Sequence, residues 1–303
     1  MRVHLHIGVH FTNTPRLAQA VRINQRVYKR QNVVAPNVDD YRAQIDDLLH
    51  RVDGQAATLD ESRALLTRLA GDESTTGLVM VDEQWCGPLE SAFEDRMLYA
   101  GLADRVRQIS NVFNAADLHV SMSIINPATL IGSVLDNGHA AGHANWFATN
   151  IPAPDVSWMP CIDRIQEAAP HVPLTIWTEE DAPLIWERIL RHLGDLNDDV
   201  AVRGPLTAVR DMLSKEGGER LTAYAKKFTP ASQAALERVS LAFLDKYEQV
   251  KTVGPAGGIP GWTHDDLAEI TAGYDDDIAA LSKRSGVTVL QPVHATDTLG
   301  ADQ

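Results

Sequence analysis

Short apolar segments with the character of β-strands alternate along this chain with segments of helical pattern. The strand segments are residues 3–9, 77–83, 117–125 and 173–180, and residues 287–292 are a candidate for a fifth. Apolar residues recur at helical spacing after the first and the fourth of these strands. Strands that alternate with helices form a mostly parallel sheet that helices cover on both faces. The sequence therefore predicts an α/β fold.

The last third of the chain differs from this alternation. From about Leu206 the pattern is nearly all helical until the last strand candidate, apart from the glycine-rich stretch 252–262. No linker rich in proline, glycine or serine precedes Leu206. We therefore expect residues 206–285 to form a helical cap or extension within a single domain that spans residues 1–303.

Charge and the length of apolar runs limit the partners. The 303 residues carry a formal net charge of −14, and no lysine-rich or arginine-rich run offsets it. Such a chain repels a phosphate backbone, so we expect no nucleic-acid partner. Because no apolar run is long enough to cross a bilayer and no secretion leader is evident, we expect a cytoplasmic protein that contacts no membrane.

Cys86 and Cys161 match no metal or redox spacing and are expected to be reduced, buried thiols. The oligomeric state stays open.

The first strand runs into the stretch "GVHFTNTPRL", residues 8–17. Thr14 is predicted to cap the following helix, with Pro15 at its first position, where the missing N–H of proline costs nothing. The free N–H groups and the dipole of a helix N-terminus attract anions without any basic side chain. This stretch is a candidate anion site, and an ordinary strand-to-helix turn is the alternative.

The opening stretch "HLHIGVHFTNTPRLAQAV" is followed by "GLVMVDEQWCG", "SMSIINPATLIGSV" and "WMPCIDRIQEAAPHVPLTIWTEEDAP". In order and spacing these stretches, all within residues 1–190, resemble motifs of the bacterial sulfotransferase family. The resemblance implies a P-loop NTPase-like α/β fold whose first loop holds the 5′-phosphosulfate end of 3′-phosphoadenosine 5′-phosphosulfate (PAPS). It also implies transfer of the sulfuryl group to a hydroxyl or amine of an unidentified small-molecule or glycan acceptor.

The donor site departs from the family's pattern at charged positions. The resemblance assigns cofactor binding to Gly8, Thr12, Asn13, Thr14, Arg16 and Ser133. The family's loop has the form G-x-[HP]-K-T-G-[TS]-[TS], and here Phe11 stands at its lysine, Asn13 at its second glycine and Pro15 at its last hydroxyl residue. Ile125 stands at the arginine that holds the 3′-phosphate. A lysine ammonium stabilises charge on the leaving phosphate, and a hydroxyl substitutes poorly for a guanidinium. We therefore expect a remodelled donor site or a lost one.

Two residues are candidates for catalysis. Glu83 ends the second strand segment, and the resemblance makes it a general base toward an acceptor hydroxyl, although a carboxylate that caps a turn is the alternative. His10 matches the histidine of some family loops, and together with Arg16 it could offset the missing lysine.

His139 and His143 lie four residues apart, but a third ligand is missing, so we expect no metal site.

Three functions are compatible with these residues. The first is sulfuryl transfer from PAPS with a remodelled donor site. The second is a non-catalytic protein of the sulfotransferase fold that serves as a binding or assembly module. The third is another transferase or a hydrolase that uses Glu83 on the same scaffold. The resemblance alone does not choose among them, because function depends on the site and not on the fold.

Overall fold

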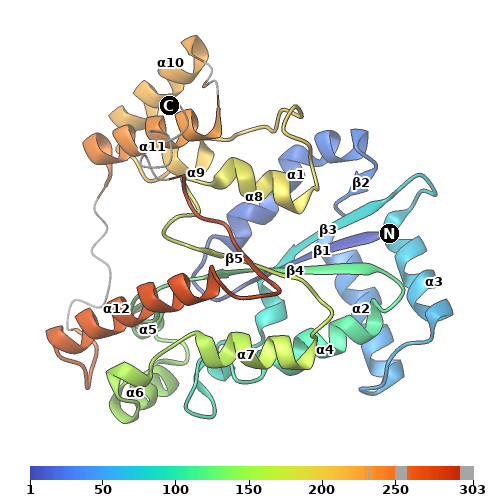
Figure 1. Cartoon of the computed structure of the whole chain (residues 1–303), viewed down its shortest axis with the longest axis horizontal. Helices are drawn as coiled ribbons and strands as arrows, with labels where there is room; N and C mark the ends of the chain where they lie inside the picture. The colour runs from blue at the N-terminus through green and yellow to red at the C-terminus, as the bar shows by residue number, and fades with distance from the viewer. Residues whose placement is uncertain (229, 231, 250–257, 294–303) are drawn as a thin grey trace.

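A six-stranded parallel sheet forms the centre of the molecule (Figure 1). The computed structural model describes residues 1–228, 230, 232–249 and 258–293. The strands are β1 (Arg2–Gly8), β2 (Val33–Val34), β3 (Gly77–Asp82), β4 (Asp117–Ile124), β5 (Leu174–Thr178) and β6 (Val287–Val289). They lie in the order β2-β3-β1-β4-β5-β6, and each neighbouring pair is parallel. The predicted α/β fold is confirmed.

The register places the ends of three strands together. Ile7 pairs with Asp82 of β3, and Gly8 pairs with Ser123 of β4. β1 thus lies between β3 and β4, and the fifth strand candidate is confirmed as β6. Only β2 was not predicted, because a strand of two residues is too short to show an alternating pattern.

Helices cover both faces of the sheet. They are α1 (Thr14–Arg30), α2 (Val38–Val52), α3 (Leu59–Ala70), α4 (Leu102–Val112), α5 (Pro127–Asn137), α6 (Ala141–Asn150), α7 (Met159–Ala168), α8 (Trp186–Leu193), α9 (Thr207–Arg210), α10 (Lys215–Lys227), α11 (Gln233–Tyr247) and α12 (His264–Leu281). Three short 3₁₀ helices, η1 (Glu83–Cys86), η2 (Leu89–Phe93) and η3 (Ala153–Asp155), lie in the connections. Figure 1 shows α1 and α8 on one side of the sheet, and α4 and α7 on the other.

Alternating side chains of β1 separate the two layers of the core. Val3, Leu5 and Ile7 belong to the large apolar cluster on the side of α4 and α7. His4 and His6 point to the side of α8, where His6 stacks on Trp177 with ring centroids 4.7 Å apart. Burial lowers the pKa of both histidines to about 3, so these side chains are neutral parts of the core.

The predicted helical stretch 206–285 is helical, but its members pack in two places. Val209 of α9, Leu213 of the connection that follows and Leu221 of α10 form a small buried cluster of their own, with side chains of α11 against it. Helix α12 instead joins the main core through Ile270 and Tyr274. Residues 252–257 of the glycine-rich stretch lie outside the described residues. Within the part of the chain that is described, no helix has the length and apolar character needed to cross a bilayer.

The connections that follow β1 and β4 leave the sheet on opposite faces. The chain passes from β1 into α1, whose Leu17 packs on the side of α8, and from β4 into α5, whose Leu130 packs on the other side. In open parallel sheets the carboxyl ends of two such strands are the usual place for a ligand. A ligand site is therefore expected near Gly8, at the end of β1.

Candidate functional site

The loop between β1 and α1 is held by its own hydroxyl groups. The Thr12 hydroxyl donates to the carbonyl of Val9 over 2.7 Å, and it lies 3.0 Å from the hydroxyl of Thr14. Both threonine side chains are buried. Helix α1 begins at Thr14 with Asn13 as its N-cap, so the prediction that Thr14 caps the helix and Pro15 opens it is wrong by one residue. The reason is that Thr14 turns its hydroxyl toward Thr12 and packs over Gly8.

A carboxylate from elsewhere in the chain lies beside this loop. The side-chain amide of Asn13 donates to Glu179, which directly follows β5. The backbone N–H of Glu179 donates to the carbonyl of Ile124 over 2.7 Å, which fixes the residue at the end of β4. Burial raises the pKa of Glu179 to about 7, although hydrogen bonds from the backbone and the side chain of Asn13 act in the opposite direction. An internal carboxyl group thus occupies the N-terminus of α1, the candidate site for an external anion.

The other expected cofactor residues have partners within the protein. Arg16 forms an ion pair with Asp211, at the end of α9, with 2.9 Å between nitrogen and oxygen. Ser133 lies in the second turn of α5 and donates to the carbonyl of Thr129 over 2.8 Å. The structure therefore brings Gly8, Thr12, Asn13 and Thr14 together in one loop, with Arg16 in the first turn of α1. Ser133 belongs to a helix on the opposite face of the sheet.

The two positions where the family's charged residues are missing have different surroundings. Phe11 is 38% exposed and adopts a left-handed backbone conformation with φ of 64°. Ile125 is 5% exposed, and its carbonyl accepts a hydrogen bond of 2.9 Å from the indole N–H of Trp158. A basic side chain is accommodated at the first position, whereas at the second it would enter the core.

His10 packs inside the protein beside the loop. Its Nδ1 lies 2.9 Å from the Tyr99 hydroxyl, and its ring lies 3.6 Å from Sγ of Cys86. Burial lowers the pKa of His10, which favours the neutral ring. Cys86 and Cys161 are free and buried, as expected, and burial raises the pKa of each thiol to about 12. Neither thiol is therefore a nucleophile near neutral pH.

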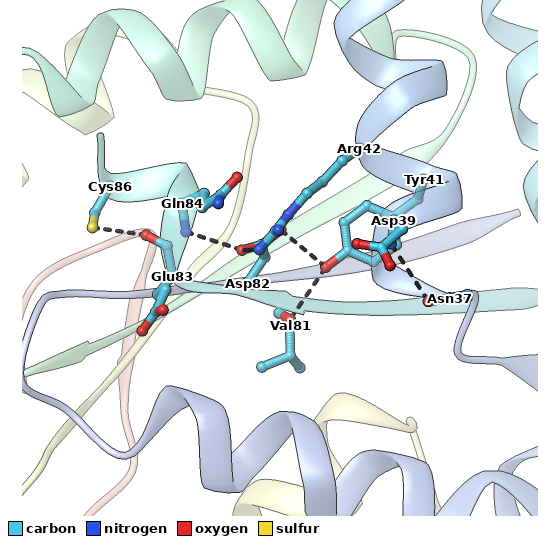
Figure 2. Close-up of polar contacts among 9 residues, drawn as sticks. All are labelled: Asn37, Asp39, Tyr41, Arg42, Val81, Asp82, Glu83, Gln84 and Cys86. Carbon is cyan, nitrogen blue, oxygen red and sulfur yellow. Dashed lines mark hydrogen bonds and ion pairs between the residues drawn. The ribbon is translucent and has the colours of Figure 1, made fainter. Parts of the chain in front are cut away.

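Asp82, at the end of β3, is at the centre of a polar network that the sequence did not reveal. Figure 2 shows the guanidinium of Arg42, from α2, against both carboxylate oxygens of Asp82. The Tyr41 hydroxyl lies 3.3 Å from Asp82 and also contacts the carbonyl of Val81, and the backbone N–H of Gln84 donates to Asp82 over 3.0 Å. Asp82 is buried and fully engaged, so it joins α2 to the sheet and is not a free base.

Glu83 lies on the other side of the strand end. In Figure 2 its side chain points away from the Asp82–Arg42 pair, to the same side as the side chain of Val81. Glu83 is exposed and lines a cavity of about 520 Å³ between α1, α2 and β3. Of the two expected catalytic residues, Glu83 lines this cavity with a carboxylate that forms no ion pair among the described residues, whereas His10 is packed against Tyr99 and Cys86.

The two histidines that were considered for a metal do not share a helix. His143 lies in α6, whereas His139 precedes that helix and lies 3.1 Å from the carboxylate of Glu90. Among the described residues no group of three or more histidine, cysteine, aspartate or glutamate side chains has a geometry that could hold a metal ion.

No protein-family model, curated protein or solved structure matches this chain. The fold is therefore described at the level of a parallel α/β sheet with C-terminal helices.

Proposed function

We propose that this chain is a sulfotransferase-like protein that acts by binding a small molecule and not by transferring a sulfuryl group. The observation that carries the proposal is the contact between Glu179 and Asn13 at the N-terminus of α1. A carboxyl group at this position repels a phosphosulfate when it is ionised and excludes it by volume when it is neutral. The protein's own acid thus closes the loop that would hold the donor.

The residues present do not fit PAPS. Phe11 stands where the family has its loop lysine, and the buried Ile125 stands where it has the arginine for the 3′-phosphate. Each lost charge-assisted contact is worth about 1.5–3 kcal/mol, so together they lower donor affinity by roughly two to four orders of magnitude. Arg16 does not replace them, because it is paired with Asp211. We derive no reaction step through this cofactor.

Sulfuryl transfer to a hydroxyl or amine acceptor is the second candidate function. One observation favours it: Glu83 borders a cavity with a carboxylate that forms no ion pair within the described part of the chain. A carboxylate so placed suits a general base. A carboxylate in this position also suits a residue that holds a ligand, and the proposal gives Glu83 that role.

Calorimetric titration with the desulfated cofactor, 3′-phosphoadenosine 5′-phosphate, tests the proposal directly. The wild-type protein is expected to show no binding in the micromolar range. A micromolar dissociation constant, or sulfuryl transfer from PAPS to any acceptor, would overturn the proposal.

A double variant tests whether Glu179 is what closes the loop. Phe11→Lys supplies a cation at an exposed position, and Glu179→Gln removes the internal charge but keeps an oxygen that accepts from Asn13. Together they should raise affinity for the desulfated cofactor at least tenfold over wild type, because attraction replaces repulsion. Arg26→Gln, on the exposed side of α1, is the control and should leave the affinity for the desulfated cofactor unchanged. A folded double variant without any gain would contradict the role given to Glu179.

A further inference from the structure

The cavity beside Glu83 exists because β2 is short. β2 pairs only with Gly77 and Leu78, so the edge of β3 from Val79 onward has no neighbouring strand. The connection from β2 to α2 and the start of α2 line the cavity on one side, and α1 lines it on the other. Tyr41 of α2 reaches the edge itself, where its hydroxyl donates to the carbonyl of Val81. The cavity of about 520 Å³ fills the space between them. It is large enough for a small organic ligand.

The walls of the cavity are mainly apolar. Val79 and Val81 of β3, with Ala18 and Val21 of α1, line one side, and Ala35, Pro36, Val38 and Tyr41 line the other. Residues of α1 from Thr14 to Gln25 line the cavity, and Arg22 lies about 12 Å along the helix from Thr14 at the rise of an α-helix. This cavity between α1, β3 and the β2–α2 connection is called the slot below.

The slot carries one unpaired charge of each sign. Arg42 and Asp82 also line it, but they neutralise each other. Glu83 lies at the end where α1 begins, and Arg22 lies two turns farther along α1. Both are exposed, and in the described ranges neither lies within ion-pair distance of an opposite charge. The two charges are thus separated along the slot by the apolar wall.

We propose that this slot binds an elongated small molecule with an ammonium group at one end, an anionic group at the other and an apolar middle. Glu83 receives the ammonium and Arg22 receives the anionic group. The partly exposed apolar side chains of Ala18, Pro36 and Val38 contact the middle. Charge-assisted hydrogen bonds at the two ends set the orientation, and burial of the apolar middle adds affinity. The inference rests on the ligand-binding role proposed above and specifies the ligand class.

The probe is 8-aminooctanoate, an extended chain with an amine at one end and a carboxylate at the other. Calorimetry should show binding that is at least tenfold tighter than that of octanoate or of octylamine, each of which lacks one charge. Arg22→Gln should remove the advantage over octylamine, and Glu83→Gln should remove the advantage over octanoate. Arg26→Gln, one turn beyond Arg22 and outside the slot, is the matched control and should bind like wild type.

A variant that fills the slot gives an independent test. Ala18→Phe places a ring in the cavity from the wall of α1, where Ala18 is only partly buried, and should abolish binding of the probe. Binding that persists in folded Ala18→Phe, or no binding to wild type, would overturn the inference. Neither result depends on the donor loop, which is tested separately by the titration with the desulfated cofactor. Failure of this inference is therefore distinguishable from failure of the proposed function.

Discussion

A carboxyl group at the start of a helix experiences two opposing effects. The helix N-terminus and its N–H donors favour the ionised form, whereas burial favours the neutral form. At Glu179 burial wins, because the pKa is raised to about 7 even though Asn13 donates to the carboxylate. In the sequence Glu179 belongs only to a strand segment, whereas in the structure it is a titrating group next to the loop before α1.

This titration makes a prediction for stability. In the unfolded chain Glu179 ionises near its ordinary pKa of 4.5, and in the folded protein near 7. Between these values the folded state binds more protons, so the contribution of Glu179 to stability falls as pH rises. The loss amounts to about 3 kcal/mol and is complete above pH 7. Glu179→Gln keeps the acceptor for Asn13 and should escape this loss.

Urea unfolding of wild type and Glu179→Gln at pH 5 and pH 8 checks the prediction. The variant should gain about 2.5 kcal/mol over wild type between the two pH values, because a small part of the loss has already occurred at pH 5. His4 and His6, whose lowered pKa values make the fold less stable in acid, are present in both proteins and cancel in the difference. A stability difference that stays constant with pH would show that Glu179 does not titrate in this range.

At the scale of the element, the β1–α1 unit is defined by how closely the helix approaches the strand end. A Cβ added to Gly8 would lie 1.4 Å from Oγ1 of Thr14, and the threonine is buried and hydrogen-bonded in place. The glycine is therefore required by contact and not by a left-handed backbone, since Gly8 has an ordinary φ.

Gly8→Ala should destabilise the protein by about 3 kcal/mol or more, because overpacking forces the first turn of α1 away from the sheet. Thr14→Ala removes the blocking hydroxyl and methyl, so the double variant should recover part of the loss. Urea unfolding of the two single variants and the double variant measures this coupling. Gly273→Ala, in α12 with nothing within 4 Å, is the control and should be neutral or slightly stabilising. Additive effects at Gly8 and Thr14 would argue against the contact.

At the scale of the whole molecule, the C-terminal helices divide between two cores of different size. The cluster of α9 and α10 contains Val209, Leu213 and Leu221 as its buried members, whereas α12 joins the cluster that contains the sheet. The buried Glu237 of α11 lies 3.8 Å from Arg188 of α8 and accepts a hydrogen bond from the backbone N–H of Val293. A small apolar cluster and a polar attachment stabilise less than the main core.

We therefore expect α10 and α11 to open without global unfolding. Native-state hydrogen exchange should show backbone amides of α10 and α11 exchanging at least tenfold faster than those of α12 and of β1. Glu237→Gln weakens the attachment to Arg188 and should accelerate exchange in α11 without affecting α12. Equal protection of all three helices would show that the C-terminal helices and the sheet form one cooperative unit.

Local sequence pattern was enough for the strands, the parallel sheet and the helical character of residues 206–285. Strand alternation and helical spacing reflect which side chains of one segment share a face, so they are legible within a few residues. The two-residue strand β2 could not be predicted, because it is shorter than the alternating pattern that indicates a strand. Gly8 and the candidate Glu83 could be identified from their place at strand ends, and the two buried cysteines from their number and spacing.

Tertiary structure alone decided what surrounds those residues. Asn13 and Glu179 are 166 positions apart, and Arg42 and Asp82 are 40 apart, so no local pattern pairs them. The order of the strands brings the end of β5 to the start of α1, and the shortness of β2 leaves the slot between Arg22 and Glu83. Periodicity records which face of an element is buried, whereas the partner of a side chain across the sheet depends on the path of the whole chain.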